Sequence, residues 1–181
     1  CEWVRQSMEL FRRNKWFSSG ILYWMFNDCW PCTRSWTVVD YYLRRTPSFY
    51  SVRRGFAPVS VALCQNGGQV DIIGINDTLE EFEGTLLFGA FRWDGTYVVK
   101  TEQTVIVRAE SAHVIATLPD STVEIDGCDA VAFAVLYDKN GTQLSASRLI
   151  HSTYDCLPLE QASIDVHMEN GKAVFVSDRP V

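Results

Sequence analysis

The stretch Val59-Ser-Val-Ala-Leu-Cys-Gln-Asn-Gly-Gly-Gln-Val-Asp-Ile72 decides the fold of most of this chain. The apolar side chains of Val59, Val61 and Leu63 recur at every second position, which is the period of a β-strand. Asn66-Gly67-Gly68 is a turn signal, because glycine adopts the positive φ angles of a tight turn at no steric cost. The stretch therefore predicts two antiparallel strands joined as a hairpin.

The same pattern of an apolar strand followed by a turn signal recurs towards the C-terminus. It occurs at residues 85–93 before Asp-Gly, at 131–137 before a turn with Asn-Gly, and at 164–168 before another Asn-Gly. Short strands at such spacing predict an antiparallel, immunoglobulin-like β-sandwich over residues 57–153. Residues 154–181 are then expected to be a linker and the first hairpin of a further β-domain. Because a lone hairpin is marginally stable in water, we expect that domain to be truncated here.

Residues 1–56 differ in composition from the rest of the chain. They carry nine basic and four acidic side chains, whereas residues 57–181 carry seven basic and 18 acidic ones. They also hold five of the six tryptophans. This contrast indicates two differently built parts that join near Phe56.

The first part predicts two helices around one buried strand. Apolar residues at helical spacing predict an amphipathic helix over residues 2–14. The continuous apolar run over residues 21–26 is typical of a strand that is buried on both faces. Thr46-Pro47 starts a second helix that runs to about Gly55, with threonine as the cap residue and proline at the first helical position. Helix, buried strand and helix indicate an α/β architecture.

Composition and charge exclude several classes of protein. The hydrophobic fraction of 47% is that of a packed globular chain rather than a disordered one. A net charge of −6 and a pI near 5.0 give no basic surface for nucleic acid. No apolar segment approaches the roughly 20 residues that cross a bilayer. We expect no nucleic-acid partner, no membrane association and a cytoplasmic location, with any targeting signal upstream of residue 1.

The six cysteines are widely spaced in a chain with ample core, so free thiols are expected. Cys29-Trp-Pro-Cys32 matches the redox pattern C-x-x-C, but a thiol oxidoreductase requires a helix that begins at the first cysteine. No second pair of cysteine or histidine ligands stands at zinc-binding spacing elsewhere. The sequence therefore predicts neither a metal site nor a cofactor.

The stretch Gly20-Ile-Leu-Tyr-Trp-Met-Phe-Asn-Asp-Cys-Trp-Pro31 resembles β-mannosidases of glycoside hydrolase family 2. Ser35-Trp36, Asp40-Tyr-Tyr42 and Phe56-Ala-Pro58 continue the resemblance. It implies that residues 1–56 are the C-terminal end of a catalytic TIM barrel. The expected fold class is thus an α/β remnant, made of the last strand and helices of that barrel, followed by the sandwich and the first hairpin of a further β-domain.

The resemblance also implies a function for these residues. The chain is expected to be a fragment of a retaining exo-β-mannosidase, which hydrolyses terminal non-reducing β-D-mannose residues of β-linked mannosides or related oligosaccharides. Trp24 is expected to form the floor of the sugar pocket, because an indole face packs against the C–H-rich face of a pyranose. Asn27 and Asp28 are expected to bind its hydroxyl groups. Trp30 and Trp36 are expected to pack and shape the loop.

The catalytic residues are expected outside this chain. Retaining glycosidases use two carboxyl groups, one as nucleophile and one as acid/base. In the family both are glutamates in N-E and S-E-x-G contexts, and neither context occurs in residues 1–181. Both glutamates are therefore expected upstream of residue 1, in the missing catalytic barrel of the same polypeptide. The chain by itself is expected to be inactive.

Two other functions remain open at this point. One is a different activity of family 2, either exo-β-glucosaminidase or β-galactosidase; exo-β-glucosaminidases tend to have Asn-Asn where Asn27-Asp28 stands. The other is a non-catalytic carbohydrate-binding or scaffolding β-sandwich. That function predicts a line of exposed aromatic side chains on one sandwich face, for which Trp93 and Tyr97 are the candidates.

Overall fold

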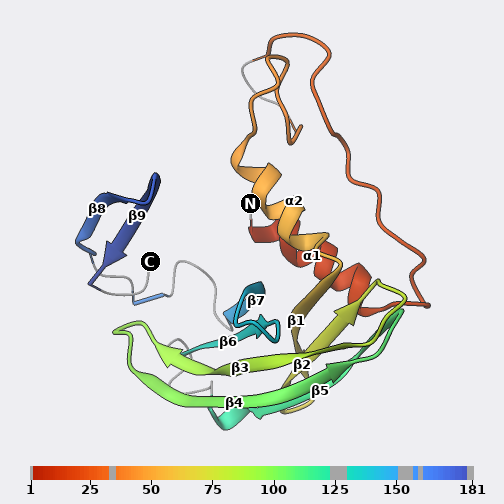
Figure 1. The fold of residues 1–181 in the computed structure, drawn as a ribbon, viewed down its shortest axis with the longest axis vertical. Coiled ribbons are helices and arrows are strands. Elements are labelled where there is room, and N and C mark those ends of the chain that lie inside the picture. The colour runs from red at the N-terminus through yellow and green to blue at the C-terminus, as the bar shows by residue number, and fades with distance from the viewer. Residues whose placement is uncertain (1, 33–35, 123–129, 151–156, 159–160, 179–181) are drawn as a thin grey trace.

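The computed structural model describes residues 2–32, 36–122, 130–150, 157–158 and 161–178 (Figure 1). Two helices come first, followed by nine strands and one short 3-10 helix among the described residues. Their bounds are α1 (Glu2–Arg13), α2 (Pro47–Gly55), β1 (Val59–Asn66), β2 (Gln69–Asn76), β3 (Phe82–Arg92), β4 (Tyr97–Val107), β5 (Ser111–Pro119), η1 (Asp120–Thr122), β6 (Ala130–Tyr137), β7 (Gln143–Ile150), β8 (Ile164–Glu169) and β9 (Lys172–Ser177).

Strands β1 to β7 form an immunoglobulin-like sandwich of two antiparallel sheets. One sheet has the order β1-β2-β5 and the other has the order β4-β3-β6-β7. The hairpin predicted from the opening stretch is confirmed, since β1 pairs with β2 from Val59 opposite Asn76 to Asn66 opposite Gln69. Gly67 and Gly68 make its turn with φ angles of 53° and 95°. A side chain is strained at such angles, which is why glycine stands there.

The main core lies between the two sheets, and β6 contributes two alanines and a leucine to it. Ala132, Ala134 and Leu136 of that strand are fully buried against the opposite sheet. The alternate residues Val131 and Phe133 are also buried, with 1% and 8% of their surface exposed, on the outer face of the four-stranded sheet. Strand β6 is therefore buried on both faces, which explains its continuous apolar run.

The two predicted helices are confirmed, whereas the predicted strand at residues 21–26 is wrong. These residues belong to a long irregular arm between α1 and α2, which extends beyond α2 in Figure 1. Leu22 is fully exposed and Phe26 is 66% exposed. A strand needs a neighbour for its backbone hydrogen bonds. Among the described residues, the backbone bonds to this run come from Val38 and Val39 at its end, so no sheet forms.

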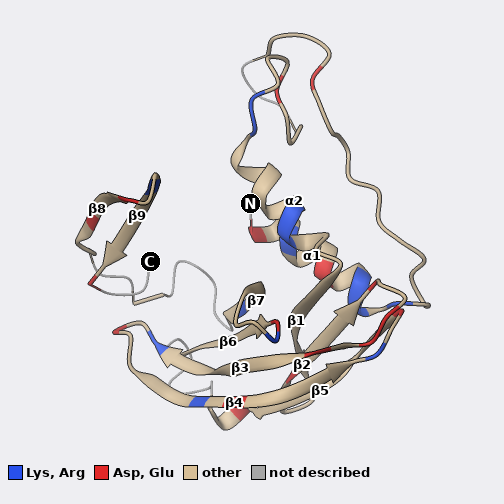
Figure 2. Ribbon diagram, in the orientation of Figure 1, with Lys and Arg blue, Asp and Glu red and all other residues tan. Residues whose placement is uncertain are grey.

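Helix α1 packs against both α2 and the sandwich. Met8 is completely buried, and its side chain lies so close to Gly55 of α2 that a Cβ atom at Gly55 would stand 2.8 Å from the Met8 sulfur. Basic side chains gather on both helices, whereas several acidic ones lie on the turns of the sandwich (Figure 2). Basic side chains of the helices and acidic side chains of the sandwich therefore lie close together where α1 packs against the sandwich.

The C-terminal hairpin β8–β9 forms as predicted and stands apart from the sandwich in Figure 1. Its apolar residues Ile164, Val166, Met168 and Phe175 are each at least half exposed. In the part of the chain that the structure describes, no helix has the length and apolar character needed to cross a membrane.

The turn between β6 and β7 gives a prediction about pH. The Asp138 carboxylate accepts hydrogen bonds from the backbone N–H groups of Thr142, at 2.7 Å, and Asn140, at 2.8 Å. The bond from Thr142 is the main cause that lowers the pKa of Asp138 below its ordinary value. A carboxyl group of this kind stabilises the fold above its unfolded pKa, and the contribution is lost as the pH falls through the folded pKa.

We therefore expect the melting temperature of the wild type to fall more steeply between about pH 5 and pH 2 than that of Asp138→Asn. Circular dichroism melts at a series of pH values measure the difference. An NMR titration of the aspartate side chains identifies the group responsible. Parallel curves for the two proteins would contradict this assignment.

Candidate functional site

The segment that carries the predicted site residues runs beside residues 37–39. The backbone N–H groups of Val38 and Val39 donate to the carbonyl of Phe26, at 3.2 and 2.9 Å, and the N–H of Asp28 donates to the carbonyl of Val39 at 3.3 Å. The hydroxyl group of Tyr23 donates to the carbonyl of Trp36 at 3.1 Å. These contacts hold the outgoing and returning limbs of the arm together.

Asp28 is buried at the centre of this contact. Its side chain accepts a hydrogen bond of 3.0 Å from the hydroxyl of Thr37, and only 7% of the residue is exposed. The hydroxyl of Thr46 in turn donates to the carbonyl groups of Thr37 and Val38, at 3.3 and 3.1 Å. Thr46 is the N-cap residue of α2 as predicted, but its side chain makes no capping bond and binds the arm instead. A chain of polar contacts thus joins Asp28 to the start of α2.

Trp24 and Asn27 lie on the open side of the same segment. Trp24 is 74% exposed, and its peptide bond to Met25 is cis. Asn27 is exposed and donates from its amide to the carbonyl of Asp28 at 3.3 Å. The structure therefore leaves the Trp24 and Asn27 side chains exposed on the same segment that carries the buried Asp28.

The returning limb is closed by a tight turn at Asp40. Its carboxylate accepts from the backbone N–H of Arg44 at 2.9 Å and from the Arg44 guanidinium at 2.6 Å. Removal from water raises the pKa of Asp40, but the bonds and charge of Arg44 outweigh that effect and the pKa lies below the ordinary value. The Asp40 carboxylate is therefore ionised at neutral pH and paired with Arg44 of the same turn.

The structure also places the other candidate residues. No helix begins at Cys29; Cys29 and Cys32 are exposed free thiols outside any helix, which removes the condition for a thiol oxidoreductase. Within the described residues, no three histidine, cysteine or acidic side chains gather in a way that could hold a metal ion. Glu83 is a residue of β3 and forms an ion pair of 2.8 Å with Lys139.

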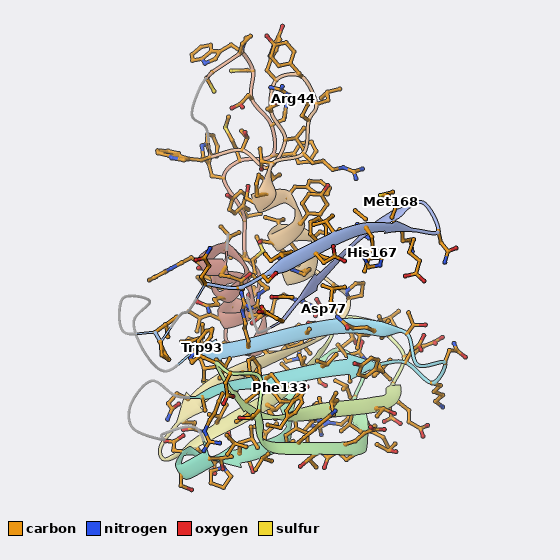
Figure 3. The ribbon with its side chains drawn as sticks, turned by 90° about the vertical axis from the view of Figure 1, so that its left-hand side faces the viewer. Arg44, Asp77, Trp93, Phe133, His167 and Met168 are labelled. Atoms are coloured by element: carbon orange, nitrogen blue, oxygen red, sulfur yellow. The ribbon has the colours of Figure 1, made fainter. Side chains whose placement is uncertain are left out.

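Among the described residues of the sandwich, aromatic side chains do not form the exposed line that a carbohydrate-binding sandwich predicts, and Trp93 is partly buried. Tyr97 is 54% exposed, with the Lys100 ammonium 4.8 Å from its ring centre. Phe133 is buried between Tyr97 and Phe91, at ring distances of 5.7 and 5.8 Å (Figure 3 labels Phe133 and Trp93). One exposed ring, already in contact with a cation, gives little surface for a saccharide.

The sequence did not reveal Thr37 as the partner of Asp28, or Thr46 as the residue that binds the carbonyl groups of Thr37 and Val38. Both contacts depend on the way the arm folds back, which no spacing in the sequence indicates. The only local signal was Thr46 before a proline, which correctly predicted the helix start.

Comparisons with known proteins agree with one another. Residues 68–150 match the family model described as Mannosidase Ig/CBM-like domain. A β-mannosidase B of Thermothelomyces thermophilus is 30% identical over 154 residues, which cover 71% of this chain and 18% of that protein. The β-mannosidase B of Aspergillus terreus is 52% identical over 44 residues, covering 24% of this chain and 5% of that protein.

Solved structures extend the similarity to nearly the whole chain. The crystal structure of β-D-mannosidase from Dictyoglomus thermophilum superposes with a TM-score of 0.84 and 26% identity, over 97% of this chain and 22% of that one. The exo-chitosanase of Amycolatopsis orientalis shares the fold, with a TM-score of 0.63 and 22% identity over 90% of this chain and 18% of that one. The chain thus spans about a fifth of the length of these relatives.

Proposed function

Because this chain is β-mannosidase-like, of glycoside hydrolase family 2, and residues 68–150 form a mannosidase Ig/CBM-like domain, we propose that it is part of a retaining exo-β-mannosidase. The enzyme would remove terminal non-reducing β-D-mannose residues from β-linked mannosides. The observation that carries the proposal is the superposition on the Dictyoglomus β-D-mannosidase, because it includes the arm as well as the sandwich.

In this proposal residues 1–56 are the last strand and helices of a catalytic TIM barrel, residues 57–153 are a supporting sandwich, and residues 154–181 begin a further β-domain. Exposure of the arm supports the first assignment. Large apolar side chains that soluble proteins normally cover stand open along it. They include Trp16, Phe17, Leu22, Trp24, Phe26, Trp30 and Trp36. Barrel strands of the longer polypeptide would cover most of this surface.

The sugar would lie against Trp24, with Asn27 and Asp28 beside it. Trp24 supplies an open aromatic face, and Asn27 supplies an amide near the same edge. Asp28 accepts a hydrogen bond from Thr37, so its part would be to fix the loop beside the sugar and to bind a hydroxyl group of the ring. Both catalytic glutamates would come from outside residues 1–181, from the ends of other barrel strands.

The proposal is tested by hydrolysis of an aryl β-mannoside. The longer polypeptide, with its upstream barrel, is expected to release the aryl group, and the 181-residue chain at equal concentration is expected to release none. Aryl β-glucosaminide and β-galactoside in parallel assays decide among the activities of family 2. Preference for either of these substrates, or turnover by the 181-residue chain, would contradict the proposal.

Within the longer polypeptide, Trp24→Ala is expected to lower kcat/KM for the mannoside by about 10-fold to 100-fold. The physical reason is the loss of the flat face that orients the sugar ring at the reaction centre. Trp36→Ala, which removes another exposed indole of the same arm, is the matched control and is expected to change kcat/KM less than threefold, roughly 0.6 kcal/mol. Equal losses in the two variants would show that Trp24 has no special role.

A further inference from the structure

A rigid turn of the sandwich lies at the root of the arm. Asn76, which is fully buried, donates from its amide to the carbonyl groups of Val107 and Glu80, at 3.1 and 2.8 Å. Its side-chain oxygen accepts from the backbone N–H and the hydroxyl of Thr78, at 2.9 and 2.7 Å. The N–H of Asp77 donates to the carbonyl of Pro58 at 2.9 Å. The position of Asp77 is therefore set by the sandwich core.

The Asp77 carboxylate binds two cations from the N-terminal part, one with each oxygen. Its Oδ2 atom lies 2.8 Å from the Arg12 guanidinium, and its Oδ1 atom lies 2.8 Å from the Lys15 ammonium. Partial burial raises the pKa of Asp77, but the Lys15 hydrogen bond and the Arg12 charge outweigh it, and the pKa lies below its ordinary value. Figure 3 labels Asp77 close to the helices, above the strands of the sandwich.

Arg12 connects Asp77 to three parts of the chain, namely α2, the connection to the sandwich and strand β1. Its guanidinium donates to the carbonyl groups of Gly55 and Ala57, at 2.7 and 2.8 Å, and to the hydroxyl of Ser60, at 3.1 Å. These partners are the end of α2, the connection to the sandwich and strand β1. The Arg12 side chain is 8% exposed and its charge-assisted bonds to the backbone and to Ser60 are partly buried, whereas the Asp77 side chain is 45% exposed.

Lys15 connects Asp77 to the arm itself. The Lys15 ammonium donates to the carbonyl of Asn76 at 3.1 Å and stands 5.3 Å from the ring centre of Trp16. An isolated β-bridge joins Lys15 to Ser18. A cavity of about 380 Å³ is lined by Asp77, by Lys15 and by arm residues up to Ile21. The arm therefore leaves the helix at Asp77 and reaches Trp24 within nine residues.

We propose that Asp77 is a positioning residue for the sugar pocket: through Lys15 and Arg12 it holds the root of the arm, and so sets where Trp24 stands. The inference rests on the proposed function, since it concerns the same sugar site. Because Asp77 belongs to the sandwich, the sandwich would take part in the reaction by fixing the position of Trp24. A displacement of the reacting groups by about 1 Å costs on the order of 100-fold in rate.

The activity test uses the longer polypeptide. Asp77→Asn, which keeps the size but removes the charge, is expected to lower kcat/KM for the aryl β-mannoside by about 10-fold to 100-fold. Asp77→Glu retains the carboxylate and is expected to recover part of that loss. Asp94→Asn is the matched control, since Asp94 is also an aspartate in a turn of the sandwich, but its carboxylate accepts from Thr96 of its own turn and, among the described residues, from no residue of α1 or the arm.

A structural readout on the 181-residue chain separates this inference from the proposed function. Amide chemical shifts and hydrogen exchange of residues 15–28 are expected to change in Asp77→Asn and to stay unchanged in Asp94→Asn. If the wild-type longer polypeptide has no mannosidase activity, the proposed function fails, while these shifts still decide whether Asp77 holds the arm. The inference is overturned if the shifts of the arm do not change, or if folded Asp77→Asn keeps kcat/KM within twofold of the wild type.

Discussion

Arg5→Met is expected to lower the free energy of unfolding of this chain by about 3 to 5 kcal/mol, the usual cost of leaving a buried charge without its partner. Arg5 is 3% exposed. Its guanidinium contacts the carboxylates of Glu9 at 2.6 Å and Glu2 at 2.8 Å, and the hydroxyl of Ser147 at 3.0 Å. Methionine fills a similar volume without the charge, so Glu9 would remain buried opposite Ser147 with no cation.

The two glutamates respond differently to the same arginine. Burial raises the pKa of Glu9 above its ordinary value in spite of Arg5. Burial also raises the pKa of Glu2, but there the charge and hydrogen bond of Arg5, together with the charges of Arg148 and Arg54, outweigh it and the pKa lies below its ordinary value. A carboxyl group with a raised folded pKa favours the fold below its unfolded pKa, and that contribution is lost as the pH rises through the folded pKa. The loss in Arg5→Met is therefore expected to be larger at pH 8 than at about pH 5.

Urea unfolding followed by tryptophan fluorescence measures both the loss and its dependence on pH. Glu2→Gln is the matched control, because it removes a carboxylate from the same cluster at a partly exposed position. Its expected cost is about 1 kcal/mol or less. A cost for Arg5→Met no larger than that of Glu2→Gln would contradict the role assigned to the buried cluster.

Gly89→Ala is the second substitution with a large expected effect, a loss of about 3 kcal/mol or more. Gly89 lies in the middle of β3, opposite Lys100 of β4. A Cβ atom there would overlap the carbonyl oxygen of Val99 and stand 2.7 Å from the Val99 carbonyl carbon. Because these atoms are backbone atoms of the neighbouring strand, they can move only if β3 and β4 separate.

Thermal unfolding followed by near-ultraviolet circular dichroism measures this loss. Gly20→Ala is the control, since no atom lies within 4 Å of a Cβ atom at Gly20, and its expected effect is within about 0.5 kcal/mol. Equal melting temperatures for the two variants would mean that β4 moves away from Gly89 without cost.

The β-sandwich could be predicted from the sequence because its signals are local. A period of two reports a strand, and Gly67-Gly68 or Asn140-Gly141 reports the turn that follows, whatever lies elsewhere in the chain. The sandwich strands that the sequence did not single out, β4, β5 and β7, have polar residues on exposed positions and so give a weaker pattern. The two helices were predicted for the same reason, from spacing and from Thr46-Pro47.

The candidate site stays a prediction. Trp24, Asn27 and Asp28 lie on one segment of the arm because they are close in the chain. Burial of Asp28 against Thr37 was not predicted, because it depends on the return of the arm. The run at residues 21–26 is apolar enough for a buried strand, yet burial depends on neighbouring strands, and those within the described residues do not provide a sheet.

By itself, then, the sequence determined the hairpins, the helices and the resemblance to β-mannosidases, all of which depend on residues near one another. Tertiary structure alone decided which polar side chains meet from distant parts of the chain. Arg5 contacts Ser147, which lies 142 positions away, and Arg12 contacts Asp77, which lies 65 positions away. Such pairs form because α1 packs against the sandwich with its apolar face. Where that face contacts the sandwich depends on tertiary packing and not on any local pattern.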